Sequence, residues 1–151
     1  MKFEFVSDQN KKNNMGYYEA KLPQRADKGS AGYDFYSPAS FVIRPQEKIF
    51  LWSNVKCKLG TDEVLMIYPR SSLAMKKGLV LGTVTGVIDA SYYNNEDNEG
   101  NIGLPLYNMS DKDIEITVGD RIAQGVAIKY ITAEDDIVLG ERTGGFGSSG
   151  K

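Results

Sequence analysis

The chain is divided into many short apolar segments by turn-forming residues, and this division constrains its fold more than any other feature. The segments at 41–43, 48–52, 64–68, 79–84, 114–118 and 122–128 are rich in β-branched and aromatic residues. Residues 114–118 also alternate apolar and polar side chains, as a strand with one buried face does. Turn signals such as Arg44-Pro45 and Gly119-Asp120 separate the segments. This spacing predicts an antiparallel all-β sandwich or jelly roll.

Only one helix is expected, a short one over 71–77, with Gly78 in the position of its C-terminal cap. Residues 94–101 (NNEDNEGN) are polar and acidic, so they predict an exposed loop. The 151 residues show no internal repeat and predict a single domain with a buried core.

The composition argues against several classes of protein. A net charge of −2 disfavours nonspecific binding to DNA or RNA. No apolar run reaches membrane-spanning length, and the polar N-terminus does not predict a signal peptide, so we expect a cytoplasmic protein. The single Cys57 makes no internal disulfide. Because the chain has no histidine, a general base must be a carboxylate, Lys, Tyr or Cys.

The tail GGFGSSGK contains the G-x-x-x-x-G-K pattern of a phosphate-binding P-loop. A P-loop also needs a helix that begins after the lysine, and the sequence ends at Lys151, so we do not expect one. A flexible Gly/Ser tail is the ordinary interpretation of this composition. A pure linker does not explain Phe146 or Arg142.

Four further segments could carry chemistry, and each also has an ordinary structural interpretation. Asp34, in AGYD, could be a ligand or a turn residue. Ser71 could cap the helix or, with Arg70, bind phosphate. Residues 78–92 are typical of a hairpin that ends at Asp89, which could be functional or merely solvated. In GDRIAQ, Gln124 can point inward from a strand.

Taken in order, the segments AGYD, PRSSLAMKKG, GVIDASY, GDRIAQ and RTGGFGSSG resemble the five motifs of the trimeric deoxyuridine triphosphatase (dUTPase) family. The resemblance covers nearly the whole chain. It implies a distorted jelly roll, or β-clip, with one short helix, assembled as a homotrimer with active sites between subunits. It also implies hydrolysis of dUTP to dUMP and pyrophosphate with Mg²⁺.

The resemblance implies a role for each matched residue. Asp89 would be the base that activates water for attack at the α-phosphorus. Asp34 would hold Mg²⁺ through water, and the ion would offset the charge of the phosphates. The phosphate site would consist of Arg70, Ser71, Ser72 and Gln124.

Shape would select the base and the sugar. The backbone of 82–88 would pair with uracil and leave no room for a thymine methyl, and Tyr92, or Tyr93 as an alternative, would pack beneath the deoxyribose. The implied contacts in this part are Thr83, Gly86, Val87, Ile88, Tyr92 and Gly103.

The tail resembles the family's mobile arm, 141–151, which closes over a neighbouring subunit's site and belongs to the same domain as the body, 1–140. Phe146 would stack on uracil. Arg142, four residues before Phe146 where the family usually has five, would contact the γ-phosphate. Gly147, Ser148 and Ser149 complete the implied contacts of the arm.

The sequence departs from the family pattern at Thr83, where many bacterial relatives have Asn, and after Asp89, where ASYYN replaces x-D-Y-x-G. The insert 94–101 that follows could be a tolerated loop extension. It could also be the surface on which a dUTP-responsive sensor binds a regulatory protein partner.

A third interpretation of the sequence is a dCTP deaminase, because that family shares the fold and the Arg-Ser-Ser-Leu-Ala segment. Pro105 stands where that family places its catalytic Glu, and a proline cannot transfer a proton.

Overall fold

The computed structural model describes residues 1–12 and 20–137, and the all-β prediction is confirmed. In this part of the chain one helix, α1 (Ser71–Lys77), and one 3-10 turn, η1 (Ala90–Tyr92), interrupt the strands. Both are too short to cross a membrane. The strands are β1 (Lys2–Phe5), β2 (Gln24–Arg25), β3 (Tyr33–Tyr36), β4 (Phe41–Ile43), β5 (Lys48–Trp52), β6 (Val55–Lys58), β7 (Glu63–Pro69), β8 (Leu79–Leu81), β9 (Gly86–Asp89), β10 (Gly103–Asn108), β11 (Ile114–Ile116) and β12 (Arg121–Lys129).

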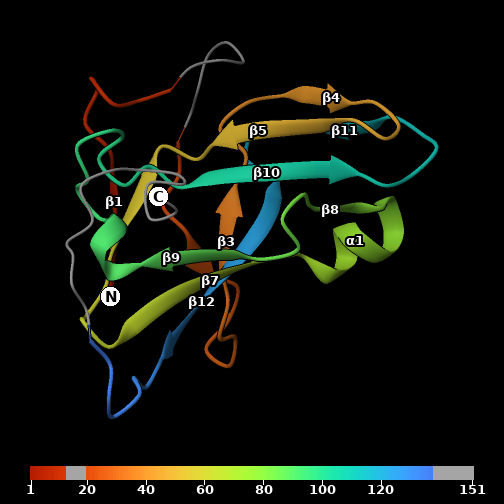
Figure 1. Cartoon of the computed structure of the whole chain (residues 1–151). Helices are drawn as coiled ribbons and strands as arrows, with labels where there is room; N and C mark the ends of the chain where they lie inside the picture. The colour runs from red at the N-terminus through yellow and green to blue at the C-terminus, as the bar shows by residue number, and fades with distance from the viewer. Residues whose placement is uncertain (13–19, 138–151) are drawn as a thin grey trace.

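Two main antiparallel sheets enclose the core. The larger sheet has the order β2-β3-β12-β7-β9 and the smaller one the order β5-β10-β8. Figure 1 shows β10 and β5 above β9, β7 and β12, with α1 beside β8. Fully buried side chains from both sheets meet between them, among them Leu51 and Leu104 from the smaller sheet and Phe35 and Leu65 from the larger.

Strand β12 lies at the centre of the larger sheet. Its register with β3 shifts between Arg121 and Ala123, and from Ala123 to Gly125 its residues alternate between the core and the outer face. Gly125 points into the core, where a Cβ would lie 3.0 Å from both Leu65 Cδ1 and Phe35 Cε2. Gln124 points to the outer face and lies opposite Asp34 on one side and Tyr68 on the other. Glycine at 125 therefore lets β3 and β7 pack closely around the central strand.

The hairpin predicted over 78–92 is wrong. Strand β8 pairs with β10, whereas β9 pairs with β7 in the other sheet. The reason is burial: Leu81 and Ile88 are 4% and 5% exposed and fill the core from opposite sides. Residues 82–85 therefore connect the two sheets. Within this connection Val84 has a φ of 67°, which is strained for a β-branched residue.

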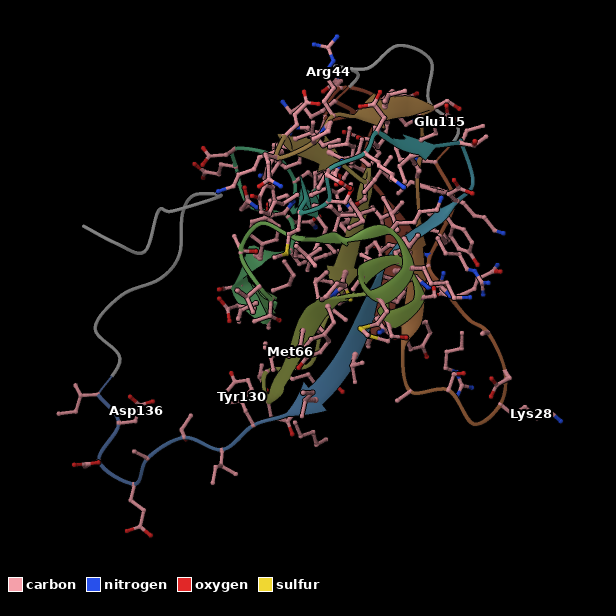
Figure 2. The ribbon with its side chains drawn as sticks, turned by 90° about the vertical axis from the view of Figure 1, so that its right-hand side faces the viewer. Lys28, Arg44, Met66, Glu115, Tyr130 and Asp136 are labelled. Atoms are coloured by element: carbon pink, nitrogen blue, oxygen red, sulfur yellow. The ribbon has the colours of Figure 1, made fainter. Side chains whose placement is uncertain are left out.

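We expect Gly125→Ala to lower the free energy of unfolding by about 1–3 kcal/mol, because the new methyl group overpacks the core. Denaturant unfolding measures this change. Gly29→Ala is the control, since a Cβ there meets only Asp27 Oδ1, at 3.4 Å, in the exposed loop where Figure 2 labels Lys28. Equal unfolding free energies for the two variants would contradict the role given to Gly125.

Candidate active site

Polar side chains from three parts of the chain meet at one end of the larger sheet. Asp34 lies on β3, Arg121 begins β12, and Arg70 follows β7. The Arg70 Nε is 2.9 Å from Asp34 Oδ1, and the Arg121 Nη1 is 3.2 Å from Asp34 Oδ2. Asp34 is only 6% exposed. Two guanidinium groups around one carboxylate leave a net positive charge, which favours an anionic ligand.

Gln124 completes this group, which we call the cation group: Asp34, Arg70, Arg121 and Gln124. The Gln124 Nε2 donates to the Pro69 carbonyl at 3.2 Å. A Cβ on Gly32 would lie 2.7 Å from Gln124 Oε1, so the glycine of AGYD makes room for this side chain. Ser71 joins Asp34, Arg70 and Gln124 around a cavity of about 380 Å³.

Helix α1 begins next to the cation group. Its N-cap residue is Arg70, in extended conformation, and no side chain caps the first turn. The interpretation of Ser71 as a helix cap is therefore wrong. Ser71 and Ser72 are both exposed at the helix start. The predicted C-terminal cap is confirmed, because Gly78 has a φ of 72° and donates to the Ala74 carbonyl.

A second cavity, of about 230 Å³, lies between the two sheets at the 82–85 connection. The Gly82 amide donates to Pro105 O at 2.8 Å and the Thr85 hydroxyl donates to Ile67 O at 2.8 Å, so the connection is bonded to both sheets. The walls combine apolar side chains with backbone polar groups, which suits a flat heterocycle. The predicted residues that line it are Thr83, Gly86, Val87, Ile88 and Gly103.

Close packing explains why residue 103 is a glycine. A Cβ at this position would lie 2.1 Å from Cζ of the Phe50 ring, which therefore packs directly over the glycine. Any side chain at 103 would push the Phe50 ring away from β10, the strand that borders the second cavity.

Asp89 follows this cavity directly, as the last residue of β9 and the N-cap residue of η1. Its side chain is exposed. Tyr92, at the other end of η1, is 3% exposed and belongs to the hydrophobic core. The Tyr92 hydroxyl donates to Asn101 O at 2.8 Å. Within one chain the Tyr92 ring therefore presents little surface to a ligand.

Asp89 and the cation group lie far apart in one chain, although they share the outer face of the sheet. Asp89 lies opposite Val64, and Gln124 lies opposite Tyr68. These two β7 positions are four residues apart, about 13 Å at strand spacing. Asp34 lies a further three strands across from Asp89, about 14 Å. We call Asp89 with the second cavity, and the cation group with the first, the two half-sites. The arm residues Arg142, Phe146, Gly147, Ser148 and Ser149 lie outside the described residues.

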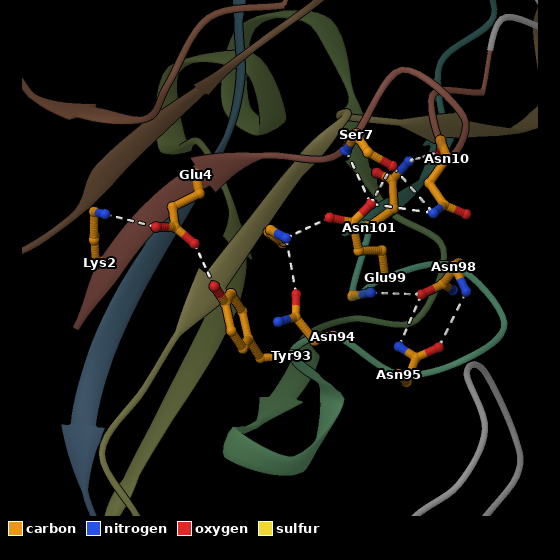
Figure 3. A network of polar contacts seen from close by, with 12 residues as sticks. Lys2, Glu4, Ser7, Asn10, Tyr93, Asn94, Asn95, Asn98, Glu99 and Asn101 are labelled. Atoms are coloured by element: carbon orange, nitrogen blue, oxygen red, sulfur yellow. Dashed lines mark hydrogen bonds and ion pairs between the residues drawn. The ribbon is translucent and has the colours of Figure 1, made fainter.

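The prediction that 94–101 forms an exposed loop is wrong for most of its residues. Its asparagines Asn95, Asn98 and Asn101 are 9%, 5% and 0% exposed. Figure 3 shows their amide groups hydrogen-bonded to one another and to neighbouring segments. Polar residues can be buried when their hydrogen bonds are satisfied. The polar composition of this loop therefore did not determine its exposure. Its exposed residues are Asn94, Glu96 and Asp97.

Glu99 attaches this loop to the rest of the protein through an ion pair with Lys56, which is 8% exposed. The ammonium group of Lys56, followed by hydrogen bonds from Ser7, lowers the pKa of Glu99 to about 2. The Lys56 Nζ also lies 5.1 Å from the centre of the Tyr93 ring.

Sequence reasoning did not single out Gly32, Arg121, Lys56 or Glu99. Gly32 lies in AGYD and Arg121 in GDRIAQ. The motif residues beside them were therefore the signal that could have identified them. No local pattern could have paired Lys56 with Glu99, because 43 residues separate them.

A pocket for a flat heterocycle, together with a cationic pocket edged by hydroxyl groups, defines a protein that handles nucleotide phosphates. The chain belongs to the dUTPase family, whose model matches residues 18–150. It is 41% identical to the deoxyuridine 5'-triphosphate nucleotidohydrolase of Lactococcus lactis over 131 residues, which cover 85% of this chain and 87% of that protein.

Solved structures agree with this assignment. The dUTPase from Streptococcus mutans superposes with a TM-score of 0.74 at 34% identity, covering 87% of this chain and 98% of that one. A mutant dUTPase from phage phi11 of S. aureus, whose structure reveals the coordination of a structural Mg(II) ion, has a TM-score of 0.70 at 26% identity. The match covers 91% of this chain and 95% of that one.

We expect the stabilising effect of Glu99 to depend on pH. Because its folded-state pKa is lowered to about 2 from 4.5, its contribution is complete above about pH 4.5 and is lost as the pH falls towards 2. Thermal unfolding of wild type and Glu99→Gln, measured from pH 6 down to about 2, should therefore show a difference that shrinks with acid. A difference that stays constant over this range would contradict the assignment. Glu96→Gln, in the exposed part of the loop, serves as the control.

Proposed function

We propose that this member of the dUTPase family hydrolyses dUTP to dUMP and pyrophosphate with Asp89 as the general base. The observation that supports this most is the position of Asp89. It is an exposed carboxylate that directly follows Ile88, a wall of the pocket for a flat base. In a chain without histidine, a carboxylate at this place is the natural acceptor for a proton from water.

In the proposed reaction Asp89 takes a proton from a water molecule as its oxygen bonds to the α-phosphorus. The bond from that phosphorus to the bridging oxygen breaks, and pyrophosphate leaves with the bonding electrons. Negative charge on the phosphate oxygens is stabilised by the hydroxyl groups of Ser71 and Ser72, the Gln124 amide and the Arg70 guanidinium.

We assign the contact with a hydrated magnesium ion that arrives with the triphosphate to Asp34, although both oxygens of this carboxylate are paired with arginines in one chain. Within residues 1–12 and 20–137 no three acidic, Cys or His side chains form a metal cluster. Asp34 is the one carboxylate of the cation group, and it would hold the ion through water once the phosphates draw Arg70 away. When bound, Mg²⁺ would neutralise phosphate charge.

We further propose that the two half-sites are joined by assembly into a homotrimer. The outer face that carries Asp89 and the cation group also exposes apolar side chains, with Val87 at 57% and Ile128 at 43% exposure. Met66 lies opposite both Val87 and Val126, and Ile128 lies opposite Val64, so apolar residues of three neighbouring strands adjoin on this face. We call them the apolar strip. A closed trimer would bury this strip and bring Asp89 of one copy towards the cation group of another.

Substrate selection is assigned to the same pocket. The 82–88 backbone would pair with uracil, and Thr83 and Gly103 would border it. Because the Tyr92 ring is buried in the core of one chain, its place beneath the deoxyribose stays a prediction from the sequence. The arm 141–151, with Arg142 and Phe146, would close over a neighbouring copy. The body-and-arm division and the cytoplasmic location stay predictions from the sequence.

No observation favours the regulatory sensor as a second function. Most of the 94–101 loop is packed against the protein, so it offers little surface to a partner.

We expect Asp89→Asn to reduce turnover by about 10²–10⁴-fold while dUTP affinity changes little, because the amide cannot accept the proton. Pyrophosphate release measures turnover, and calorimetry with a non-hydrolysable dUTP analogue measures affinity. Asp111→Asn, on an exposed loop, is the control. Wild-type pyrophosphate release by Asp89→Asn would disprove the assigned base.

Shared sites predict complementation between inactive subunits. Asp89→Asn and Gln124→Ala should each be inactive, because each damages one half-site in every copy. Co-refolded mixtures in equal amounts should recover about a quarter of the wild-type rate, since random trimers contain sites with both half-sites intact. A mixture no more active than its two components would contradict a site built from two copies.

A further inference from the structure

The loop 94–101, which we call the asparagine loop, holds Tyr92 at both ends of that residue. The Asn95 amide donates to the Tyr92 carbonyl at 2.7 Å. At the other end the Tyr92 hydroxyl donates to Asn101 O at 2.8 Å and accepts from Asn98 Nδ2 at 2.9 Å. The last residue of η1 therefore has its main chain and its side chain fixed by one loop.

The asparagine loop has a single well-defined geometry, because its buried amides bond one another. Asn95 Nδ2 donates to Asn98 Oδ1 at 2.9 Å, and the Asn98 main-chain amide donates back to Asn95 Oδ1 at 3.1 Å. Gly100, at a φ of 82°, lies so near η1 that a Cβ would be 2.8 Å from the Tyr92 carbonyl. Networks in which every buried polar group is satisfied are rigid.

One buried lysine fixes both ends of the asparagine loop to the body of the protein. The Lys56 ammonium, on β6, donates to Asn94 Oδ1 at 2.8 Å and forms the ion pair with Glu99. The second Glu99 oxygen accepts from the Ser7 amide at 2.9 Å and from its hydroxyl at 2.6 Å. Figure 3 shows these contacts joining the N-terminal segment to the loop.

We propose that the asparagine loop is a rigid support that sets the position of Asp89, and that Asn98 and Glu99 are positioning residues for hydrolysis. This inference rests on the proposed role of Asp89. Asp89 is the N-cap residue of η1 and Tyr92 is its last residue. This three-residue turn is too short to be stable by itself. Fixing Tyr92 therefore fixes the direction in which the chain leaves Asp89.

The consequence for catalysis follows from distance. A general base must meet its water within hydrogen-bond reach, and a displacement of about 1 Å lowers the rate about 100-fold. Asn98 and Glu99 act only through η1, so their loss should lower kcat and leave the binding of dUTP nearly unchanged.

The test compares two glutamates of the same loop. Glu99→Gln breaks the ion pair with Lys56, whereas Glu96→Gln makes the same chemical change on the exposed side. We expect Glu99→Gln to lower kcat at least about 10-fold with KM within about 2-fold, and to speed amide hydrogen exchange in residues 89–93. Glu96→Gln should match the wild type in all three measurements.

Asn98→Ala provides an independent variant, because it removes the hydrogen bond to Tyr92 and leaves the Glu99 ion pair in place. Far-UV circular dichroism and sedimentation would establish that each variant is folded and assembled. Wild-type kcat and wild-type exchange in both folded variants would overturn the proposal. If Asn98→Ala does not fold, wild-type values for Glu99→Gln alone would overturn it.

Asp89→Asn in the same assay separates this inference from the proposed function. If Asp89→Asn is inactive while both loop variants behave as wild type, only the supporting role of the loop fails. Full turnover by Asp89→Asn would remove the assigned base and, with it, the role given to the loop.

Discussion

The register of β12 between β3 and β7 is the constraint on which the rest of the structure depends. Because β12 is paired on both sides, Gln124 has fixed partners in Asp34 and Tyr68, while Gly125 faces the core. A slip of one residue would turn Gln124 into the core and expose the glycine. The tight packing of Phe35 and Leu65 around Gly125 prevents that slip, so core packing and the placement of the cation group have one cause.

The same sheet explains why Asp89 and the cation group lie apart in one chain. Crossing between sheets at 82–85 opens the pocket for a flat base and places β9, with Asp89, at the sheet edge. The cation group extends over β3 and β12 to the other end of β7, away from Asp89. A rigid sheet cannot bring the two together. The proposed trimer supplies the missing contact without any change in the fold of one chain.

Much of the local structure could be predicted from the sequence, because its signals are local. Helix 71–77, the Gly78 cap and the segments 41–43 and 48–52 were predicted with their observed bounds. Asp34, Arg70 and Gln124 of the cation group were also found from short patterns, whereas Arg121 was not. Strand β6 was not predicted, since its charged Lys56 is buried only through a partner 43 residues away. The exposed-loop and hairpin predictions failed for the same reason: burial and pairing depend on distant parts of the chain.

The sequence by itself determined the types of element and the chemistry that the protein carries. Turn residues, alternation and motif order need only neighbouring residues, and they decided the all-β class, the candidate base Asp89 and the family resemblance. The tertiary structure alone decided that β8 and β9 belong to different sheets, that an asparagine-rich insert is packed, and that the two half-sites lie apart. Those facts depend on which distant side chains fill one core and satisfy one another's hydrogen bonds, and no local pattern encodes that.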